Sequence, residues 1–191
     1  MGVSDHCTAV INGATGKEVV VTGGTGRGDM VIKLSMKTGK WYSLTRMQVP
    51  RRNHACAKVT LNGRPGLVVS GGMSGTNMNM TSVEFYDVGT GQWVSLPSLQ
   101  RGRRNHAMEV EDGKLMVMGG IKGRSKKKKT NYLKDSEVFD GKRWMDARQQ
   151  LRTGRQGFTV VKVPAENLRK MTRKKKKPRK VKTNKQSKQS S

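Results

Sequence analysis

The feature that most constrains this chain is a pair of glycines that closes a short apolar run and recurs at intervals of 48 residues. A tryptophan follows each pair further along the chain. The repeated set is Gly23, Gly24 and Trp41, then Gly71, Gly72 and Trp93, and then Gly119, Gly120 and Trp144. A period between about 20 and 50 residues is typical of arrays of one supersecondary unit. The sequence therefore predicts an array, which binds partners along its surface.

Each copy contains short apolar segments of strand length with turn signals between them. The first strands are predicted at 7–11, 55–60 and 107–110, the second at 18–22, 67–70 and 115–118, and the third at 31–34, 83–86 and 137–139. A fourth strand opens on the tryptophan of each copy. β-Branched and aliphatic runs bounded by glycine are typical of buried strands, and no helical period competes with them. The pattern predicts a repeated four-stranded antiparallel meander.

These motifs resemble the Kelch-repeat family, whose repeats each form one blade of a β-propeller. The resemblance rests on the apolar run with its double glycine, the segments 83–87 and 90–93, and Arg103 with His106 and Ala107. It covers residues 4–163, with blades expected at 4–48, 49–100 and 101–151 and an orphan first strand at 158–163. Propellers usually have about 4–8 blades, so this all-β fold is expected to be an incomplete β-propeller. The Kelch region is taken as residues 1–168.

An incomplete ring leaves blade edges open, and three explanations are compatible with the sequence. The chain is part of a larger propeller, or a truncated product, or it closes by self-association with another copy. The two cysteines, Cys7 and Cys56, lie in first strands and are expected to be buried, inert thiols, without a disulfide framework.

Positive charge is concentrated on one set of loops. The formal net charge of the chain is +26. In an antiparallel meander, successive loops emerge at alternating ends of the sheet. By this parity, the loops between second and third strands lie on the same face as the loops between blades. The resemblance implies that this face binds a protein partner. The arginines favour an acidic partner, because a guanidinium can hydrogen-bond a carboxylate through two of its N–H groups. The predicted partner-binding residues are Arg51, Arg52, Asn53, Arg103, Arg104, Asn105, Arg155, Lys126 and Lys127. The alternative is that these arginines pair with neighbouring acids or are simply solvated.

Residues 169–191 form a separate Lys/Arg-rich tail that is expected to be disordered, since it has no apolar face. Its densest cluster resembles a nuclear-import signal or a nucleic-acid patch and comprises Lys174, Lys175, Lys176, Lys177, Arg179 and Lys180. The alternative is a solubilising tail. No aromatic side chain interrupts the cluster, so any nucleic-acid binding is expected to be non-specific.

No catalytic constellation, cofactor motif, metal site or membrane-spanning run stands out. His6, His54 and His106 occupy equivalent positions, and packing explains this better than a shared metal. The function expected is that of a non-enzymatic protein-interaction adaptor. The resemblance extends this to substrate recognition for a ubiquitin ligase or to actin binding. The alternative is a polyanion-binding protein, and the expected location is intracellular, in the cytoplasm or the nucleus.

Overall fold

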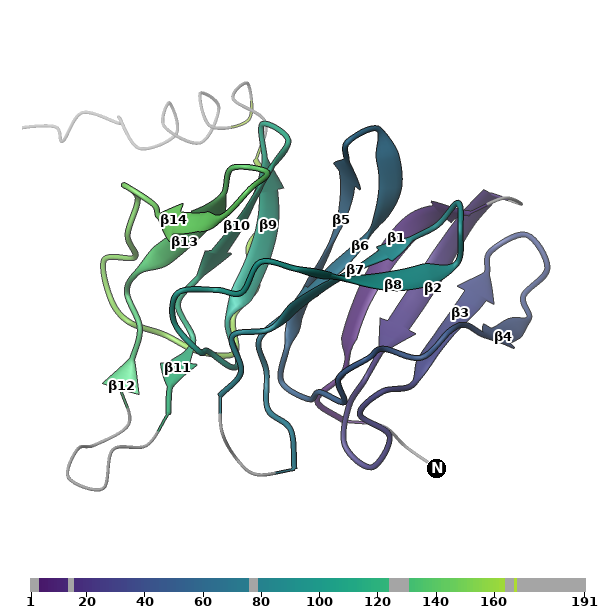
Figure 1. The fold of residues 1–191 in the computed structure, drawn as a ribbon, viewed down its shortest axis with the longest axis horizontal. Coiled ribbons are helices and arrows are strands. Elements are labelled where there is room, and N and C mark those ends of the chain that lie inside the picture. Colours follow the sequence, from purple (N-terminus) through teal and green to yellow (C-terminus); the bar gives the residue numbers. More distant parts are fainter. Residues whose placement is uncertain (1–3, 14–15, 76–78, 124–130, 164–166, 168–191) are drawn as a thin grey trace, which may run out of the picture. The chain divides into compact units, whose positions relative to one another are not determined.

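The computed structural model describes residues 4–13, 16–75, 79–123, 131–163 and 167. All of its strands lie in the compact unit Met1–Val160 (Figure 1). Blade 1 consists of β1 (Cys7–Gly13), β2 (Gly16–Thr22), β3 (Val31–Ser35) and β4 (Trp41–Ser43). Blade 2 consists of β5 (Ala55–Leu61), β6 (Arg64–Ser70), β7 (Val83–Asp87) and β8 (Gln92–Leu96). Blade 3 consists of β9 (Ala107–Glu111), β10 (Lys114–Met118), β13 (Ser136–Phe139) and β14 (Trp144–Asp146).

Within each blade, neighbouring strands pair antiparallel in chain order. The predicted meander is therefore confirmed, and the fold is an incomplete β-propeller of three four-stranded blades. Blade 1 contacts blade 2 mainly through β1 and β5, and blade 2 contacts blade 3 through β5 and β9. The first strands of the blades thus form the inner side of the array.

Two details differ from the sequence prediction. A two-stranded ribbon, β11 (Ile121–Lys122) with β12 (Asn131–Tyr132), extends the loop after the third double glycine. Residues 158–163 form no strand, although a first strand was predicted there. A strand needs a ladder partner to satisfy its backbone groups, and no described segment pairs with these residues.

The hydrophobic core is divided into two clusters, one at each junction between blades. Leu67 and Val69 of blade 2 pack with Ile11, Val20 and Val31 of blade 1. The other cluster joins Val68 and Phe85 to Leu115, Val117 and Trp144, among others. Since side chains alternate along a strand, blade 2 uses both of its faces, and this explains its continuous apolar runs.

The double glycines allow the loop between blades to approach the end of the second strand. Gly71 and Gly72 have φ values of 57° and 90°, in the left-handed region that side chains disfavour. A Cβ on Gly72 would lie 2.6 Å from the carbonyl oxygen of Arg52. The glycines at the equivalent positions of blades 1 and 3 also have positive φ. The repeat that first identifies the fold is therefore a requirement of blade-to-blade packing.

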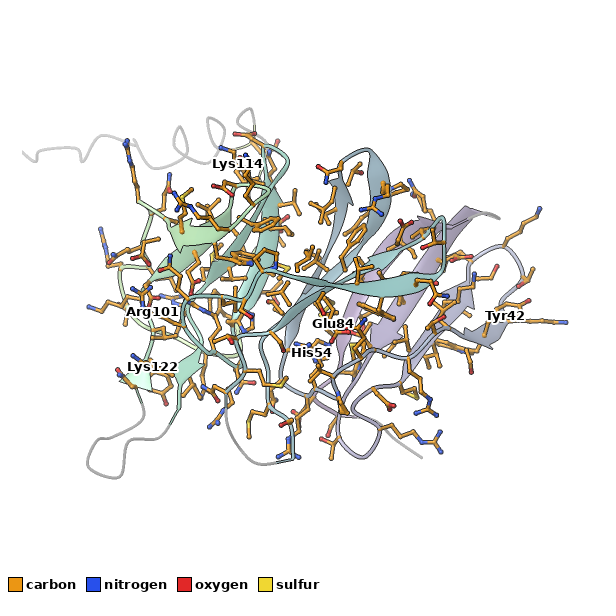
Figure 2. All side chains as sticks on the ribbon, in the orientation of Figure 1. Tyr42, His54, Glu84, Arg101, Lys114 and Lys122 are labelled. Atoms are coloured by element: carbon orange, nitrogen blue, oxygen red, sulfur yellow. A yellow bond between two sulfur atoms is a disulfide. The ribbon has the colours of Figure 1, made fainter. Side chains whose placement is uncertain are left out.

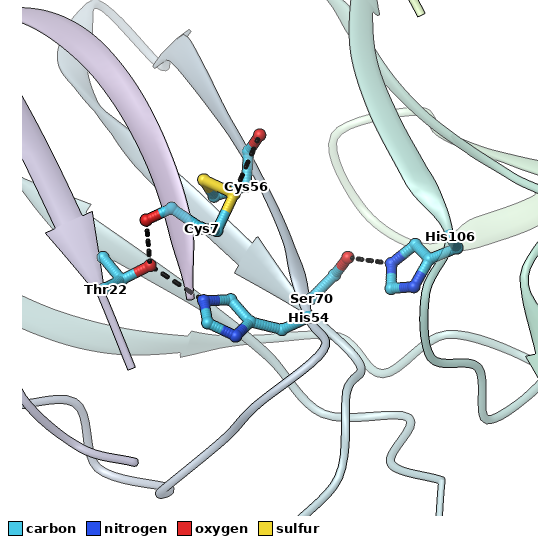
Figure 3. Close-up of a disulfide and its surroundings, with 6 residues drawn as sticks. All are labelled: Cys7, Thr22, His54, Cys56, Ser70 and His106. Carbon is cyan, nitrogen blue, oxygen red and sulfur yellow. Dashed lines mark hydrogen bonds between the residues drawn. A yellow bond between two sulfur atoms is a disulfide. The ribbon is translucent and has the colours of Figure 1, made fainter. Parts of the chain in front are cut away.

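Cys7 of β1 and Cys56 of β5 form a disulfide that links blade 1 to blade 2 (Figure 3). The prediction of two separate thiols was wrong. The residues are 49 positions apart in sequence, but the adjacent inner strands bring their Cα atoms to 6.0 Å. This spacing suits a disulfide and depends on how the blades pack, which residue spacing alone does not reveal.

Candidate partner-binding face

The loops between blades are anchored by the same backbone hydrogen bonds at each position. The amide nitrogens of Gly24, Gly72 and Gly120 donate to the carbonyl oxygens of Arg51, Arg103 and Arg155, at 3.0, 2.9 and 2.8 Å. Each loop therefore docks against the second strand of the blade before it. The parity argument for a common face is consistent with this arrangement, because the loops between second and third strands start at these same glycines.

Arg51 and Arg103, predicted to bind a partner, are instead buried, with relative exposures of 1% and 0%. The Arg51 guanidinium donates to a carboxylate oxygen of Glu84 at 2.6 Å, and Arg103 donates to Glu137 at the same distance. Arg51 and Arg103 also donate to the carbonyl oxygens of Gly71 and Gly119, the first residues of the second and third double glycines. This corrects the prediction for both residues: a guanidinium enclosed in this way is held by neighbouring acids, the alternative that the sequence left open.

The two buried acids also hold the loops between blades. Glu84 accepts hydrogen bonds from the backbone amides of Gln48 and Val49, at 2.7 and 3.2 Å. Glu137 accepts from Gln100 and Arg101 in the same manner, at 2.7 and 3.3 Å. Burial lowers the pKa of Arg51, and its hydrogen bond with Glu84 opposes that shift. Each Arg–Glu pair is thus a fixed structural joint.

Asn53 and Asn105 also have a structural role. Both have positive φ, 54° and 51°, and asparagine tolerates this conformation better than most residues. The amide of Asn105 donates to the carbonyl of Asn53, and Asn53 donates to that of Asp5, at 2.8 Å in both cases. Successive blades are therefore connected through these residues along the inner side of the array.

Arg52, Arg104 and Arg155 remain at the surface of the predicted face. Arg155 is exposed, while Arg52 and Arg104 are half-buried. Nη1 of Arg104 donates to Oδ1 of Asn79 at 3.1 Å, so this side chain is oriented by the loop between β6 and β7. Lys122 and Lys114 are labelled at opposite ends of blade 3 in Figure 2, the first on the side of these loops and the second on the other side.

A cavity of about 170 Å³ opens between blades 1 and 2 on this face. Its walls come from the loop after β2, including Thr25, the loop before β5, including Arg52, and Met73 with Ser74 after β6. Backbone hydrogen bonds between Arg52 and Met73, at 2.9 and 3.0 Å, fix the loops that form these walls. The cavity can accept one side chain of a partner beside a cationic group.

Comparison with known proteins agrees with this architecture. A Kelch motif model matches residues 50–100, which form blade 2 and its preceding loop. The Kelch repeat-containing protein kel-10 of Caenorhabditis elegans is 28% identical over 143 residues, 73% of this chain and 24% of that protein. Kelch-like protein 24 of Homo sapiens is 31% identical over 104 residues, 54% of this chain and 15% of that protein. The chain contains a Kelch motif and resembles the Kelch-repeat family.

The solved structure titled "Structure of YjhT" has the same fold, with a TM-score of 0.66 and 22% identity. The match covers 82% of this Kelch chain and 53% of that structure. An F-box/kelch-repeat protein of Arabidopsis thaliana is 30% identical over 59% of this chain and 24% of its own length. The chain thus spans about a quarter or less of the curated Kelch relatives named here.

The Kelch repeat histidines join neighbouring blades. Nε2 of His54 hydrogen-bonds Oγ1 of Thr22 at 2.8 Å, and Nε2 of His106 hydrogen-bonds Oγ of Ser70 at 2.9 Å (Figure 3). Burial, with a smaller contribution from the charge of Arg51, lowers the pKa of His54 to about 3. Burial likewise lowers the pKa of His106 well below its usual range. Both imidazoles are therefore neutral packing groups, as the sequence favoured.

Among the described residues of this Kelch chain, no three His, Cys, Asp or Glu side chains are grouped so that they could hold a metal ion. The described part also contains no helix with the length and apolar character needed to cross a membrane. Several predicted basic residues lie outside the described residues, namely Lys126, Lys127, Lys174, Lys175, Lys176, Lys177, Arg179 and Lys180.

Glu84 and Glu137, the acids that bury the arginines, were missed as structural residues. A signal for them exists in the Kelch repeats. The copies with Arg51 and Arg103 carry glutamate at the second position of the third strand, whereas the first copy has Ile32 there and Val3 in place of the arginine. Opposite charges that appear and disappear together in aligned repeats indicate a contact.

Proposed function

We propose that this chain is a non-enzymatic protein-interaction module that binds an acidic segment through its loop face. The cavity between blades 1 and 2 is the observation that carries this proposal, because Arg52 forms part of its wall. A side chain seated in the cavity would fix the partner, and a nearby carboxylate could accept hydrogen bonds from the guanidinium. The adaptor function and an intracellular location are part of the same proposal.

Arg104 extends this cationic surface towards blade 3. It follows the buried Arg103 just as Arg52 follows the buried Arg51, so the two arginines of each pair have different roles. The first of each pair holds the blade together, and the second lies at the surface. A partner strand that runs across the two junctions would meet Arg52 and Arg104 in turn.

The test is binding of a fluorescent glutamate-rich peptide, measured by anisotropy. The double substitution R52E/R104E should weaken binding about tenfold or more, since it replaces two attractive charges by two repulsive ones. The matched control is K114E/K142E, which changes the net charge equally at exposed residues of the opposite face. The proposal is wrong if both double variants bind the peptide equally well.

Polyanion binding is the second candidate, and it is supported by the net charge of +26. The same variants distinguish it when poly(U) RNA replaces the peptide. Binding through counterion release would weaken log-linearly with salt and would respond to both double variants alike. Substrate recognition for a ubiquitin ligase, or actin binding, is a further proposal that rests on family resemblance and would require a named partner.

A further inference from the structure

The outward face of blade 1, on the side away from blade 2, is apolar, and no described segment of the chain covers it. In a pleated sheet, the register places Val10, Val19, Leu34 and Trp41 on this one face. Val10 is 50% exposed and Trp41 is 53% exposed. Val21 and Ile32 lie beside them and are half-buried. A contiguous apolar sheet face of this kind is a site of association.

The equivalent faces of blades 2 and 3 show what covers such a surface. Trp93 and Trp144 occupy the position of Trp41 and are 5% and 3% exposed. The indole nitrogen of Trp93 donates to the carbonyl oxygen of Thr45 at 2.8 Å, and that of Trp144 donates to Pro97 at 3.0 Å. Each acceptor belongs to the loop that leaves the preceding blade. No segment among the described residues provides Trp41 with a neighbouring blade or exit loop of this kind.

The exit loop of blade 3 has the same form as the loops that receive Trp93 and Trp144. The amide of Leu151 donates to the carbonyl of Lys134 at 2.8 Å, as Met47 donates to Asp29 and Leu99 to Thr81. Met47 and Leu99 are buried at the two existing junctions, whereas Leu151 is half-buried. By this correspondence, Gln149 stands where Thr45 and Pro97 accept the indole hydrogen bonds.

The outward face of blade 3 completes this receiving surface. Met116, Val138 and Met145 lie side by side on it by register, and all are half-buried. It is more polar than the corresponding face of blade 2, because Glu109 replaces Ala57 and Glu111 replaces Val59. The exposed Lys17 lies on the blade 1 face, so the two end faces carry charges of opposite sign.

We propose that the open face of blade 1 binds the open face of blade 3 of a second copy of this chain. Two copies joined head to tail at both ends would form a closed ring with two-fold symmetry. Figure 1 shows blades 1 and 3 on opposite sides of blade 2, as this requires.

The new junction differs from the two within the chain in one respect that sets its strength. Arg155 stands at the position of Arg51 and Arg103, but blade 1 of the second copy would offer it Ile32 in place of a glutamate. The junction therefore has no buried Arg–Glu joint and relies on apolar contact and the indole hydrogen bond. A reversible dimer that depends on protein concentration is expected.

Sedimentation velocity of the 191-residue protein, over a concentration series that reaches about 100 μM, is the first test. A monomer–dimer equilibrium is expected, and W41A should weaken it roughly tenfold or more, as the loss of a central aromatic anchor does. The control is Y132A, which removes an aromatic side chain of similar exposure, 46%, from β12 on the loop side. Circular dichroism confirms that each variant is folded.

The head-to-tail arrangement has its own test, which uses M145D at the other end of the array. M145D and W41A should each weaken dimerisation when tested alone, but a mixture of the two variants should regain part of the dimer through one intact junction. In a head-to-head dimer, blade 1 would bind blade 1 of the second copy. M145D would not weaken such a dimer, and mixing the two variants would not increase the amount of dimer. A monomer at every concentration, or either head-to-head result, overturns the proposal.

Discussion

The two faces of blade 1 have similar composition and different environments. Alternate residues of β2 point to opposite faces, so Val20 faces blade 2 and is 0% exposed, while Val19 and Val21 face outward and are half-buried. On β1, Ile11 is 2% exposed and its neighbour Val10 is 50% exposed. The continuous run of valines indicates a strand buried on both faces. The difference shows that an apolar sheet face indicates the need for a neighbouring sheet, whereas the exposure of that face shows whether a described segment covers it.

The largest expected effect comes from placing one negative charge on the inward face of blade 1 and, in a second variant, one on its outward face. V20D should abolish folding or cost more than about 4 kcal/mol, because it buries a carboxylate within the apolar cluster between blades 1 and 2. V10D should change the free energy of unfolding by no more than about 1 kcal/mol, since its side chain is half exposed. Urea unfolding followed by circular dichroism measures both. Equal destabilisation would show that blade 1 is buried on both sides in solution.

The next effect concerns the disulfide, which fixes only the inward side of blade 1. Reduction of Cys7–Cys56 should lower the free energy of unfolding by about 2–4 kcal/mol, because it frees a loop of 49 residues in the unfolded chain. Urea unfolding with and without a reductant gives this difference. The double variant C7S/C56S should be insensitive to the reductant. Two titratable thiols in the unreduced native protein would contradict the linkage.

The smallest effect is the pH dependence of stability that arises at the junction between blades 1 and 2. The pKa of His54 is about 3 in the fold, against about 6.5 in an unfolded chain, so the unfolded state binds the extra proton between these values. The contribution of His54 to the free energy of unfolding is therefore fully present above about pH 6.5 and is lost as the pH falls towards 3. Between pH 7 and pH 5 the loss should be about 2 kcal/mol for His54 alone. His106 acts in the same direction at the other junction.

A matched variant isolates this effect. T22M/H54F places at the first junction the residue types that the chain has at the equivalent positions, Met118 and Phe158. Urea unfolding of this variant should show a smaller loss between pH 7 and pH 5 than the wild type, with only His106 of the two junction histidines remaining. An unchanged pH dependence would mean that His54 does not titrate as its buried position requires.

The strands of this protein could be predicted because their causes are local. Apolar runs, the double glycines and the turns before each tryptophan lie within a few residues of the structures they produce. The depth of the arginines could not be predicted in the same way. Arg51 and Glu84 are 33 positions apart, and parity indicates which face a loop reaches without indicating whether its side chains turn inward. The disulfide was missed for the same reason.

The sequence by itself determined the repeat, the four strands of each blade and the side of the array on which the arginines lie. These follow from backbone preferences and side-chain periodicity. Only the tertiary structure decided which arginines are joints and which reach the surface, and that Cys7 meets Cys56. It also decided that Trp41 is exposed while Trp93 and Trp144 are buried. Burial depends on the neighbouring blade, and no local pattern states whether that neighbour is there.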